Sequence, residues 1–168
     1  MSDPFPPRRE KDQFFFSPLT KMMLKTLSKR YKTVTGVFCP TLLDIPNILV
    51  FDFDERFSGQ NYVLKDLSEE NGSSFTGDLV IVDPPYTLVH NFDLTGWFSE
   101  IQKRKQHLLV SVGLCMQKKA SEWNLQKQAV LPSYNGCCNL IYQHQKGVHI
   151  QAFWYANFNL LQALLESN

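Results

Sequence analysis

The sequence has few features of a zinc-binding, disulfide-rich or membrane-spanning protein. Its four cysteines include no C-x-x-C pair and no paired histidine ligands accompany them, which argues against a zinc site. Two of the cysteines are adjacent, so they do not form a disulfide framework, and we expect a reducing compartment. No apolar run approaches the roughly 18 residues that a membrane-spanning helix needs. We therefore expect a cytoplasmic protein without a membrane partner.

An excess of basic residues is also absent. The chain has 17 Lys and Arg against 16 Asp and Glu, a net charge of +1. Duplex-binding proteins normally carry a clear basic excess, so nucleic acid is a less favoured partner than protein. At 168 residues the chain is long enough for one domain with its own core. We expect residues 13–168 to form this domain and the proline-rich, charged residues 1–12 to be a disordered lead-in.

A glycine-rich loop is missing where a nucleotide-binding fold would have one. In a doubly wound fold the first strand normally runs into a G-x-G turn, whose bare backbone approaches the ligand. Here the first predicted strand, residues 33–39, runs into Cys39-Pro40 instead. Taken alone, this absence argues against a nucleotide-type cofactor.

The strongest positive signal is the segment Leu-Val-Ile-Val-Asp-Pro-Pro-Tyr at residues 79–86. Its first four residues are a continuous apolar run, as in a strand buried on both faces of a parallel sheet. The two prolines that follow cannot donate to a sheet ladder, so the strand ends at Asp83. Ligands collect at the carboxyl ends of such strands, and we expect Asp83 and Tyr86 in the functional crevice.

The residue types in this segment suit methylation of an amino group. An attacking amine needs acceptors for its protons, and the Asp83 carboxylate and the Pro84 carbonyl are such acceptors. Pro85 adds a second rigid ring, and Tyr86 offers a flat face for a planar or cationic amine. The Asp-Pro-Pro-Tyr segment resembles the catalytic tetrapeptide of S-adenosylmethionine-dependent amino-methyltransferases. The alternative is a strand that ends in an ordinary proline turn.

The remaining pattern predicts alternating strands and helices. We expect further strands at residues 48–53, 62–65 and 107–112, and helices at 18–31, 92–105, 116–123 and 159–165. From residue 129 the pattern becomes antiparallel, with strands at 129–132, 139–143 and 148–155. This order predicts an α/β fold: a doubly wound, mostly parallel sheet with an antiparallel C-terminal hairpin. The four leucines of the last helix form one stripe that docks on the sheet or binds a partner.

Acidic residues follow the second and third predicted strands. Asp52 and Asp54 lie on one side at the end of the second strand, where such folds hold ribose hydroxyls. We prefer Asp54 because it lies nearer the mouth, and Asp66 ends the third strand as a further cofactor candidate. On spacing alone, an ion pair between Asp54 and Arg56 is an equally good interpretation.

Four segments together resemble the N6-adenine methyltransferase family that includes the lysine methyltransferase of translation elongation factor 1-alpha. Q-F-F-F-S at residues 13–17 is similar to the family's Q-F-W-Y-S, and Cys39-Pro40 stands where the family has a small residue and proline in place of G-x-G. F-D-F-D-E-R-F at residues 51–57 is similar to F-x-[YF]-D-x-R-F, and Asp-Pro-Pro-Tyr is the fourth segment. The similarity spans residues 13–155.

The resemblance implies a seven-stranded, Rossmann-like class I methyltransferase fold with helices on both faces of the sheet, and S-adenosylmethionine as the donor. It also implies roles for particular residues: cofactor contacts at Phe16, Ser17, Cys39 and Pro40, a ribose contact at Asp54, and the grip on the amine at Asp83, Pro84, Pro85 and Tyr86. The favoured activity is lysine methylation of a protein, with elongation factor 1-alpha as a candidate substrate. The alternatives are adenine N6 methylation in RNA or DNA, and a non-catalytic binding subunit.

Overall fold

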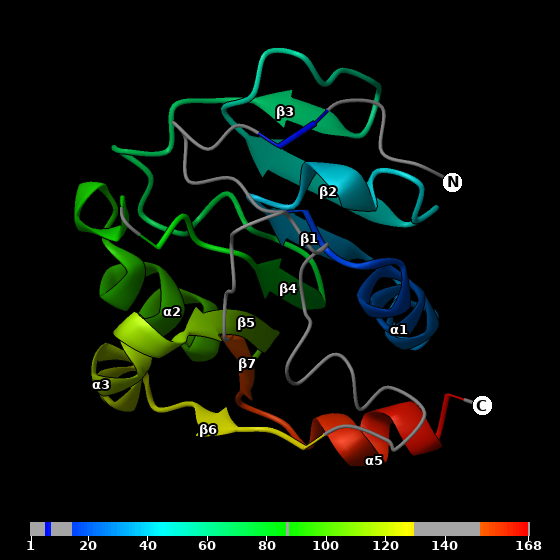
Figure 1. The fold of residues 1–168 in the computed structure, drawn as a ribbon, viewed down its shortest axis with the longest axis vertical. Helices are drawn as coiled ribbons and strands as arrows, with labels where there is room; N and C mark the ends of the chain where they lie inside the picture. The colour runs from blue at the N-terminus through cyan, green and yellow to red at the C-terminus, as the bar shows by residue number, and fades with distance from the viewer. Residues whose placement is uncertain (1–5, 8–14, 87, 130–151, 168) are drawn as a thin grey trace.

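A seven-stranded sheet with the order β3-β2-β1-β4-β5-β7-β6 forms the centre of the molecule (Figure 1). The computed structural model describes residues 6–7, 15–86, 88–129 and 152–167. The strands are β1 (Val34–Val37), β2 (Ile48–Asp52), β3 (Tyr62–Leu64), β4 (Leu79–Val82), β5 (His107–Gly113), β6 (Gln126–Lys127) and β7 (Ala152–Ala156). Neighbours from β3 to β5 pair in parallel, whereas β7 pairs antiparallel with β5 and β6. The predicted fold class is confirmed.

The strand order reverses between β1 and β4. From β1 the chain continues outward to β2 and β3, and then returns to place β4 on the other side of β1. The two strands are in register from Val34↔Leu79 to Val37↔Val82. Ligands of open α/β sheets bind in the crevice outside the carboxyl ends of two strands at such a reversal. Cys39 and Asp83 follow these two ends, so the fold brings them to the expected crevice.

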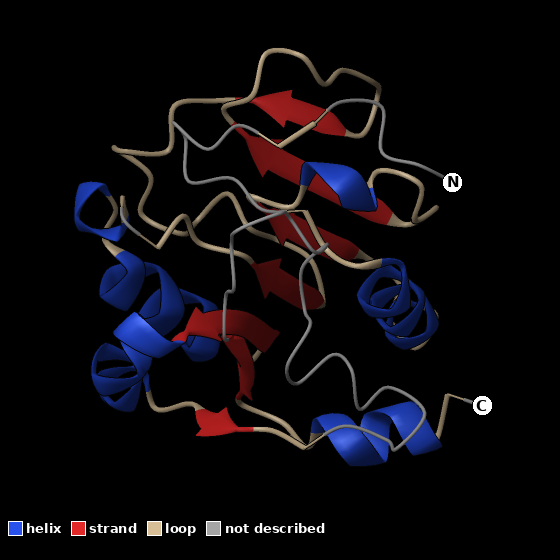
Figure 2. Ribbon diagram, in the orientation of Figure 1, coloured by secondary structure: helices blue, strands red, loops and turns tan. Residues whose placement is uncertain are grey.

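Helices cover both faces of the sheet (Figures 1 and 2). One face carries α1 (Pro18–Ser28), α5 (Leu160–Leu165) and the 3-10 turn η2 (Pro40–Leu42), and the other carries α2 (Leu94–Lys103) and α3 (Gln117–Ala120). Three further 3-10 turns are η3 (Val89–Asn91), η4 (Leu114–Met116) and η5 (Ser121–Trp123). Within β4, Ile81 packs on the α1 side while Val80 and Val82 pack on the α2 side. Burial on both faces explains the continuous apolar run of this strand.

The first helix begins as predicted and ends earlier. The Ser17 side chain caps α1 by accepting a hydrogen bond from the Thr20 N–H at 3.2 Å, and Pro18 occupies the first turn. After Ser28 the backbone forms tighter bonds, such as the one from the Tyr31 N–H to the Ser28 carbonyl at 3.1 Å. This tightening, common at helix ends, stops the helix before Tyr31. Among the described residues, no helix is long and apolar enough to cross a membrane.

The antiparallel part begins earlier than predicted. The expected strand at 129–132 is wrong at Ala129, which lies outside any strand, and β6 pairs Gln126 with Ala156 instead. Asn124 takes a left-handed conformation with φ 54°, which ends η5 and turns the chain directly into β6. The predicted strand at 139–143 and the proposed lead-in at residues 1–12, apart from residues 6–7, lie outside the described residues.

The last helix divides its leucines between two rows. Leu160 and Leu164 are fully buried in the same core cluster as α1, whereas Leu165 is 58% exposed. Adjacent helical residues lie about 100° apart, so residues 160 and 164 share one row and 161 and 165 the next. The predicted stripe therefore docks through only one of its rows, Leu160 and Leu164, and Leu165 stays exposed. Arg30 fixes this end by donating to the Ala163 carbonyl at 3.1 Å and pairing with Glu166 at 2.6 Å.

Leucine substitutions in α5 test this docking. We expect Leu164→Ala to lower the free energy of unfolding by about 2–5 kcal/mol, because it leaves a cavity in the core. The matched variant Leu165→Ala, at an exposed position, should change it by less than about 0.5 kcal/mol. Urea unfolding measures both. Equal losses in the two variants would contradict the docking of one row.

Candidate active site

Asp83 extends the sheet by one residue beyond β4. Its backbone N–H donates to the Val37 carbonyl at 3.0 Å, so strand alternation continues and the side chain lies on the same face as Ile81. Asp83 is only 9% exposed. In β5, the Ser111 hydroxyl donates a hydrogen bond to Asp83 Oδ1. The predicted acceptor is thus a buried carboxylate with a fixed donor.

Polar side chains form a row across the α1 side of the sheet near its carboxyl edge. The row has one residue from each of four strands, with β1 between the first two: Asp52 at the end of β2, Asp83 just after β4, Ser111 in β5 and Trp154 in β7. All four are buried, and Ser111 lies directly opposite Trp154. The Trp154 indole N–H has no hydrogen-bond partner in the described part of the chain. Such a row in an otherwise apolar core is typical of a ligand site.

The tyrosine of the tetrapeptide rests on the end of β5. Pro84 and Pro85 are buried, and Tyr86 is half-buried. A Cβ at Gly113 would lie 2.9 Å from both Cδ2 and Cε2 of the Tyr86 ring. Two residues of β5, Ser111 and Gly113, therefore contact the two ends of this segment.

The turn after β1 forms without glycine. Phe38 takes a left-handed conformation with φ 61°, which costs a non-glycine residue roughly 1–2 kcal/mol. Its ring packs against Phe53, Phe92 and Trp97 at centroid distances of 5.8, 5.0 and 6.1 Å. Aromatic pairs of this kind are worth about 0.5–1.5 kcal/mol each, enough to offset the strain. The absence of G-x-G is therefore no obstacle to the tight turn that such a fold needs.

Cys39, the next residue, is a buried packing residue between two acids. Its thiol donates to the Val37 carbonyl at 3.2 Å. Burial, and then the carboxylates of Asp83 and Asp52, raise the pKa of the Cys39 thiol well above its usual value. The thiol is therefore neutral and unsuited to act as a nucleophile. The thiol also lies 3.7 Å from the Ile81 carbonyl oxygen in β4, two residues before Asp83, so the Cys39-Pro40 turn lies beside the polar row.

Asp54 is held by Arg56. The buried carboxylate pairs with the guanidinium at 2.7 Å between Oδ2 and Nη2, and a second bond from Nε to Oδ1 measures 3.0 Å. Arg56 also donates to the Pro6 carbonyl at 2.9 Å, and Asp52 Oδ1 accepts the Asp54 N–H at 2.9 Å. The ion pair weighed from the spacing is therefore present. A ribose contact at Asp54 stays a prediction, and it requires the carboxylate to be shared with Arg56.

The other predicted cofactor residues lie in three places. Phe16 is buried and its ring packs against Trp154 at a centroid distance of 5.9 Å, next to the polar row. Ser17 caps α1, and its hydroxyl donates to Thr20 Oγ1 at 2.9 Å. Asp66 is exposed beyond the edge strand β3, and hydrogen bonds from Ser68 lower the pKa of Asp66. Phe16 thus lies beside the polar row, whereas Asp66 lies beyond the edge strand of the sheet.

Sequence reasoning missed Ser111, Gly113 and Trp154. Ser111 lies within a correctly predicted strand, but a single serine in an apolar run carries no signal of its own. The signal that could have found it is the parallel register, in which Val82 pairs with Val110 and the next positions are Asp83 and Ser111.

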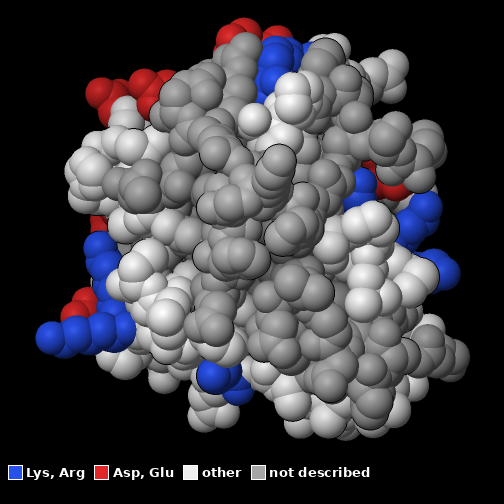
Figure 3. Space-filling model, viewed as in Figure 1, with Lys and Arg blue, Asp and Glu red and all other residues white. Residues whose placement is uncertain are grey.

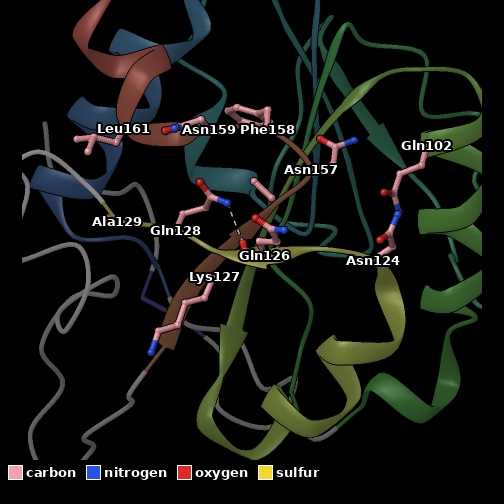
Figure 4. A pocket seen from close by; sticks show the side chains of 11 residues that line it. Gln102, Asn124, Gln126, Lys127, Gln128, Ala129, Asn157, Phe158, Asn159 and Leu161 are labelled. Atoms are coloured by element: carbon pink, nitrogen blue, oxygen red, sulfur yellow. Dashed lines mark hydrogen bonds between the residues drawn. The ribbon is translucent and has the colours of Figure 1, made fainter.

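A cleft of about 800 Å³ lies away from this site (Figure 4). It is lined largely by amide side chains: Gln102, Asn124, Gln126, Gln128, Asn157 and Asn159. Several of these amides hold the structure together, since Gln128 donates to the Gln126 carbonyl at 2.9 Å and Asn157 accepts the Leu108 N–H at 2.8 Å. Leu108 is the second residue of β5, so this cleft lies near the amino end of β5, whereas Asp83 lies at the carboxyl ends of the parallel strands.

The loop that follows β3 is anchored by Glu70. The carboxylate pairs with Lys65 at 2.6 Å and accepts the N–H groups of Asn71 and Gly72 at 3.0 and 2.9 Å. Trp97 donates to the Glu70 carbonyl at 2.6 Å. Burial opposes ionisation, but the hydrogen bonds and charge of Lys65 prevail and lower the pKa of Glu70.

This anchor predicts a pH-dependent stability. A carboxyl group whose pKa is lowered by folding contributes stability above its unfolded pKa, near 4.5, and loses it as the pH falls through the folded value. We expect Glu70→Gln to lower the free energy of unfolding by about 1–3 kcal/mol at pH 7, and this difference to shrink below pH 4.5. Denaturant unfolding between pH 7 and about 3 measures it, with exposed Glu69→Gln as the control. A difference that is constant with pH would contradict the assignment.

Comparison with known proteins agrees with this geometry. No curated protein matches the sequence. A family model described as "Probable N6-adenine methyltransferase" matches residues 7–160. The match includes the turn after β1, the acids at the end of β2 and the segment after β4. Because it covers most of the 168 residues, the chain belongs to this methyltransferase family.

Proposed function

We propose that this protein is an S-adenosylmethionine-dependent N-methyltransferase that methylates a lysine side chain of a protein. The observation that carries the proposal is the buried Asp83 carboxylate at the reversal of strand order. The Asp83 backbone N–H donates to the Val37 carbonyl, and the carboxylate accepts a hydrogen bond from the Ser111 hydroxyl. It is supported by the membership of a methyltransferase family. A carboxylate fixed in a dry crevice can orient an amine in a way that a solvated one cannot.

The chain's own residues provide positioning and exclude water. Asp83 accepts one N–H of the neutral target amine, the Pro84 carbonyl accepts the second, and the nitrogen lone pair is thereby left directed outward. Tyr86 packs its ring against the amine-bearing group, and Gly113 leaves room for that ring. When bound, S-adenosylmethionine supplies an electrophilic methyl group.

The residues beside the polar row suit this cofactor. Phe16 offers an aromatic surface, and Cys39-Pro40 forms a narrow turn of the kind that lets a ligand approach the strand ends. Asp52, the last residue of β2, and Asp54, two residues further on, are at the strand end where this class of fold holds ribose hydroxyls. Asp66 is a weaker candidate because it is exposed beyond the edge strand β3. Ser17 is a weaker candidate because its hydroxyl already caps α1.

Charge favours a protein over a nucleic acid as the substrate. On the face in Figure 3, Lys and Arg side chains of the described residues are dispersed around the rim rather than gathered in a track. The net charge is only +1. This balanced net charge is unlike the clear basic excess of proteins that bind a phosphate backbone. By resemblance, elongation factor 1-alpha is the candidate substrate.

Adenine N6 in RNA or DNA is the second candidate acceptor. The family description favours it, because it names adenine as the methylated base. An adenine amine also suits the same acceptors, and Tyr86 offers a face on which a base could stack.

Methyl transfer to a cell lysate distinguishes the acceptors. We expect radiolabelled methyl from S-adenosylmethionine to enter protease-sensitive material near the size of elongation factor 1-alpha. Label in nuclease-sensitive material would contradict the lysine proposal and would identify adenine as the methyl acceptor. No label, together with no cofactor binding, would contradict the enzymatic proposal.

Substitution of the acids separates cofactor binding from transfer. We expect Asp83→Ala to bind S-adenosylmethionine normally but to lose at least about 100-fold in transfer, because the amine loses its acceptor. Asp54→Ala should weaken binding, because it removes the predicted ribose contact. Calorimetry measures cofactor binding. The control is Asp44→Ala, which makes the same substitution at an exposed aspartate and should change neither binding nor transfer. Equal losses of both activities in both variants would refute this division of roles.

A further inference from the structure

Asp83 and Tyr86 both depend on the same strand. The Ser111 hydroxyl donates to Asp83 Oδ1, and the Tyr86 ring occupies the space that a Cβ at Gly113 would need. Residues two apart in a strand face the same side, so Ser111 and Gly113 lie on the same face of β5 and support Asp83 and Tyr86 from there.

We propose that Ser111 and Gly113 are positioning residues for the acceptor site, with Ser111 fixing the rotamer of the Asp83 carboxylate and Gly113 fixing the place of the Tyr86 ring. This inference rests on the proposed methyltransferase function. Neither residue contacts the acceptor itself in the proposal. They act through Asp83 and Tyr86.

The burial of Ser111 supports a directed hydrogen bond. Its side chain is 0% exposed, and a buried hydroxyl is costly unless it is hydrogen-bonded. Because β4 and β5 are in register, the hydroxyl lies beside the carboxylate without any distortion of the sheet. A misplacement of about 1 Å in a catalytic group can lower a rate about 100-fold, so a fixed rotamer has consequences for catalysis.

Gly113 is needed because it has no side chain, and not because its backbone conformation requires glycine. Its φ of −68° and ψ of 157° are open to every residue type. A methyl group there would lie 2.9 Å from two carbons of the Tyr86 ring, well inside the roughly 3.5–4.0 Å of a normal contact. Alanine at position 113 must therefore displace the ring.

Variants of Ser111 test the first half of the proposal. We expect Ser111→Ala to lower kcat by about 10- to 100-fold while S-adenosylmethionine affinity is unchanged, because only the amine acceptor is misplaced. Ser111→Cys, with a weak donor of similar size, should recover part of kcat. The control is Ser28→Ala, another buried serine, whose hydroxyl bonds the Lys25 carbonyl at 2.7 Å within α1. It should keep the full kcat.

Gly113→Ala tests the second half. We expect a raised KM for the acceptor and a lowered kcat, again with unchanged cofactor affinity. Crystal structures of both variants provide a readout independent of activity: the Asp83 side chain should change rotamer in Ser111→Ala, and the Tyr86 ring should move in Gly113→Ala. Unmoved side chains with unchanged kinetics would overturn the inference. A wild-type protein that neither binds the cofactor nor transfers methyl would overturn the proposed function, while the crystal structures would still decide the positioning.

Discussion

The hydrogen bond from the Asp83 N–H to the Val37 carbonyl determines where the candidate site lies. It extends the parallel ladder one residue past β4, although Pro84 and Pro85 prevent any further extension. Asp83 therefore keeps the alternation of a strand and projects on the α1 side, in line with Ser111 and Trp154. Without this bond the carboxylate would belong to a loop, and its direction would not be fixed by the sheet.

The same region shows how a tight turn can form without glycine. Phe38 adopts the left-handed conformation that a glycine would adopt more cheaply, and its ring is held by three other aromatic rings. Local strain is thus offset by packing on the α2 side, while Cys39 packs on the α1 side. The two cores of the protein jointly support the turn that the cofactor is proposed to approach.

The sequence predicted features that depend on neighbouring residues. The apolar run of β4, its end at Asp83 and the cap at Ser17 all follow from local patterns, and the alternation of elements was sufficient for the fold class. Ser111 was missed because its partner is 28 residues away and is reached only through the sheet register. The position of β6 was missed because a left-handed Asn124, not a pattern of alternation, decides where that strand begins.

Local patterns also left one question open. The spacing of Asp54 and Arg56 suits an ion pair and a ribose site equally, and the ion pair is present. Whether a ribose shares this carboxylate depends on the ligand, and no pattern of residues decides it.

The most direct test of the account is a crystal structure of the protein with S-adenosylmethionine or its demethylated product. The account predicts that the ligand lies outside the carboxyl ends of β1 and β4, with its sulfur facing Asp83 and its ribose at the acids at the end of β2, Asp52 and Asp54. A ligand in the amide-lined cleft near the amino end of β5, or no ligand at saturating concentration, would contradict it.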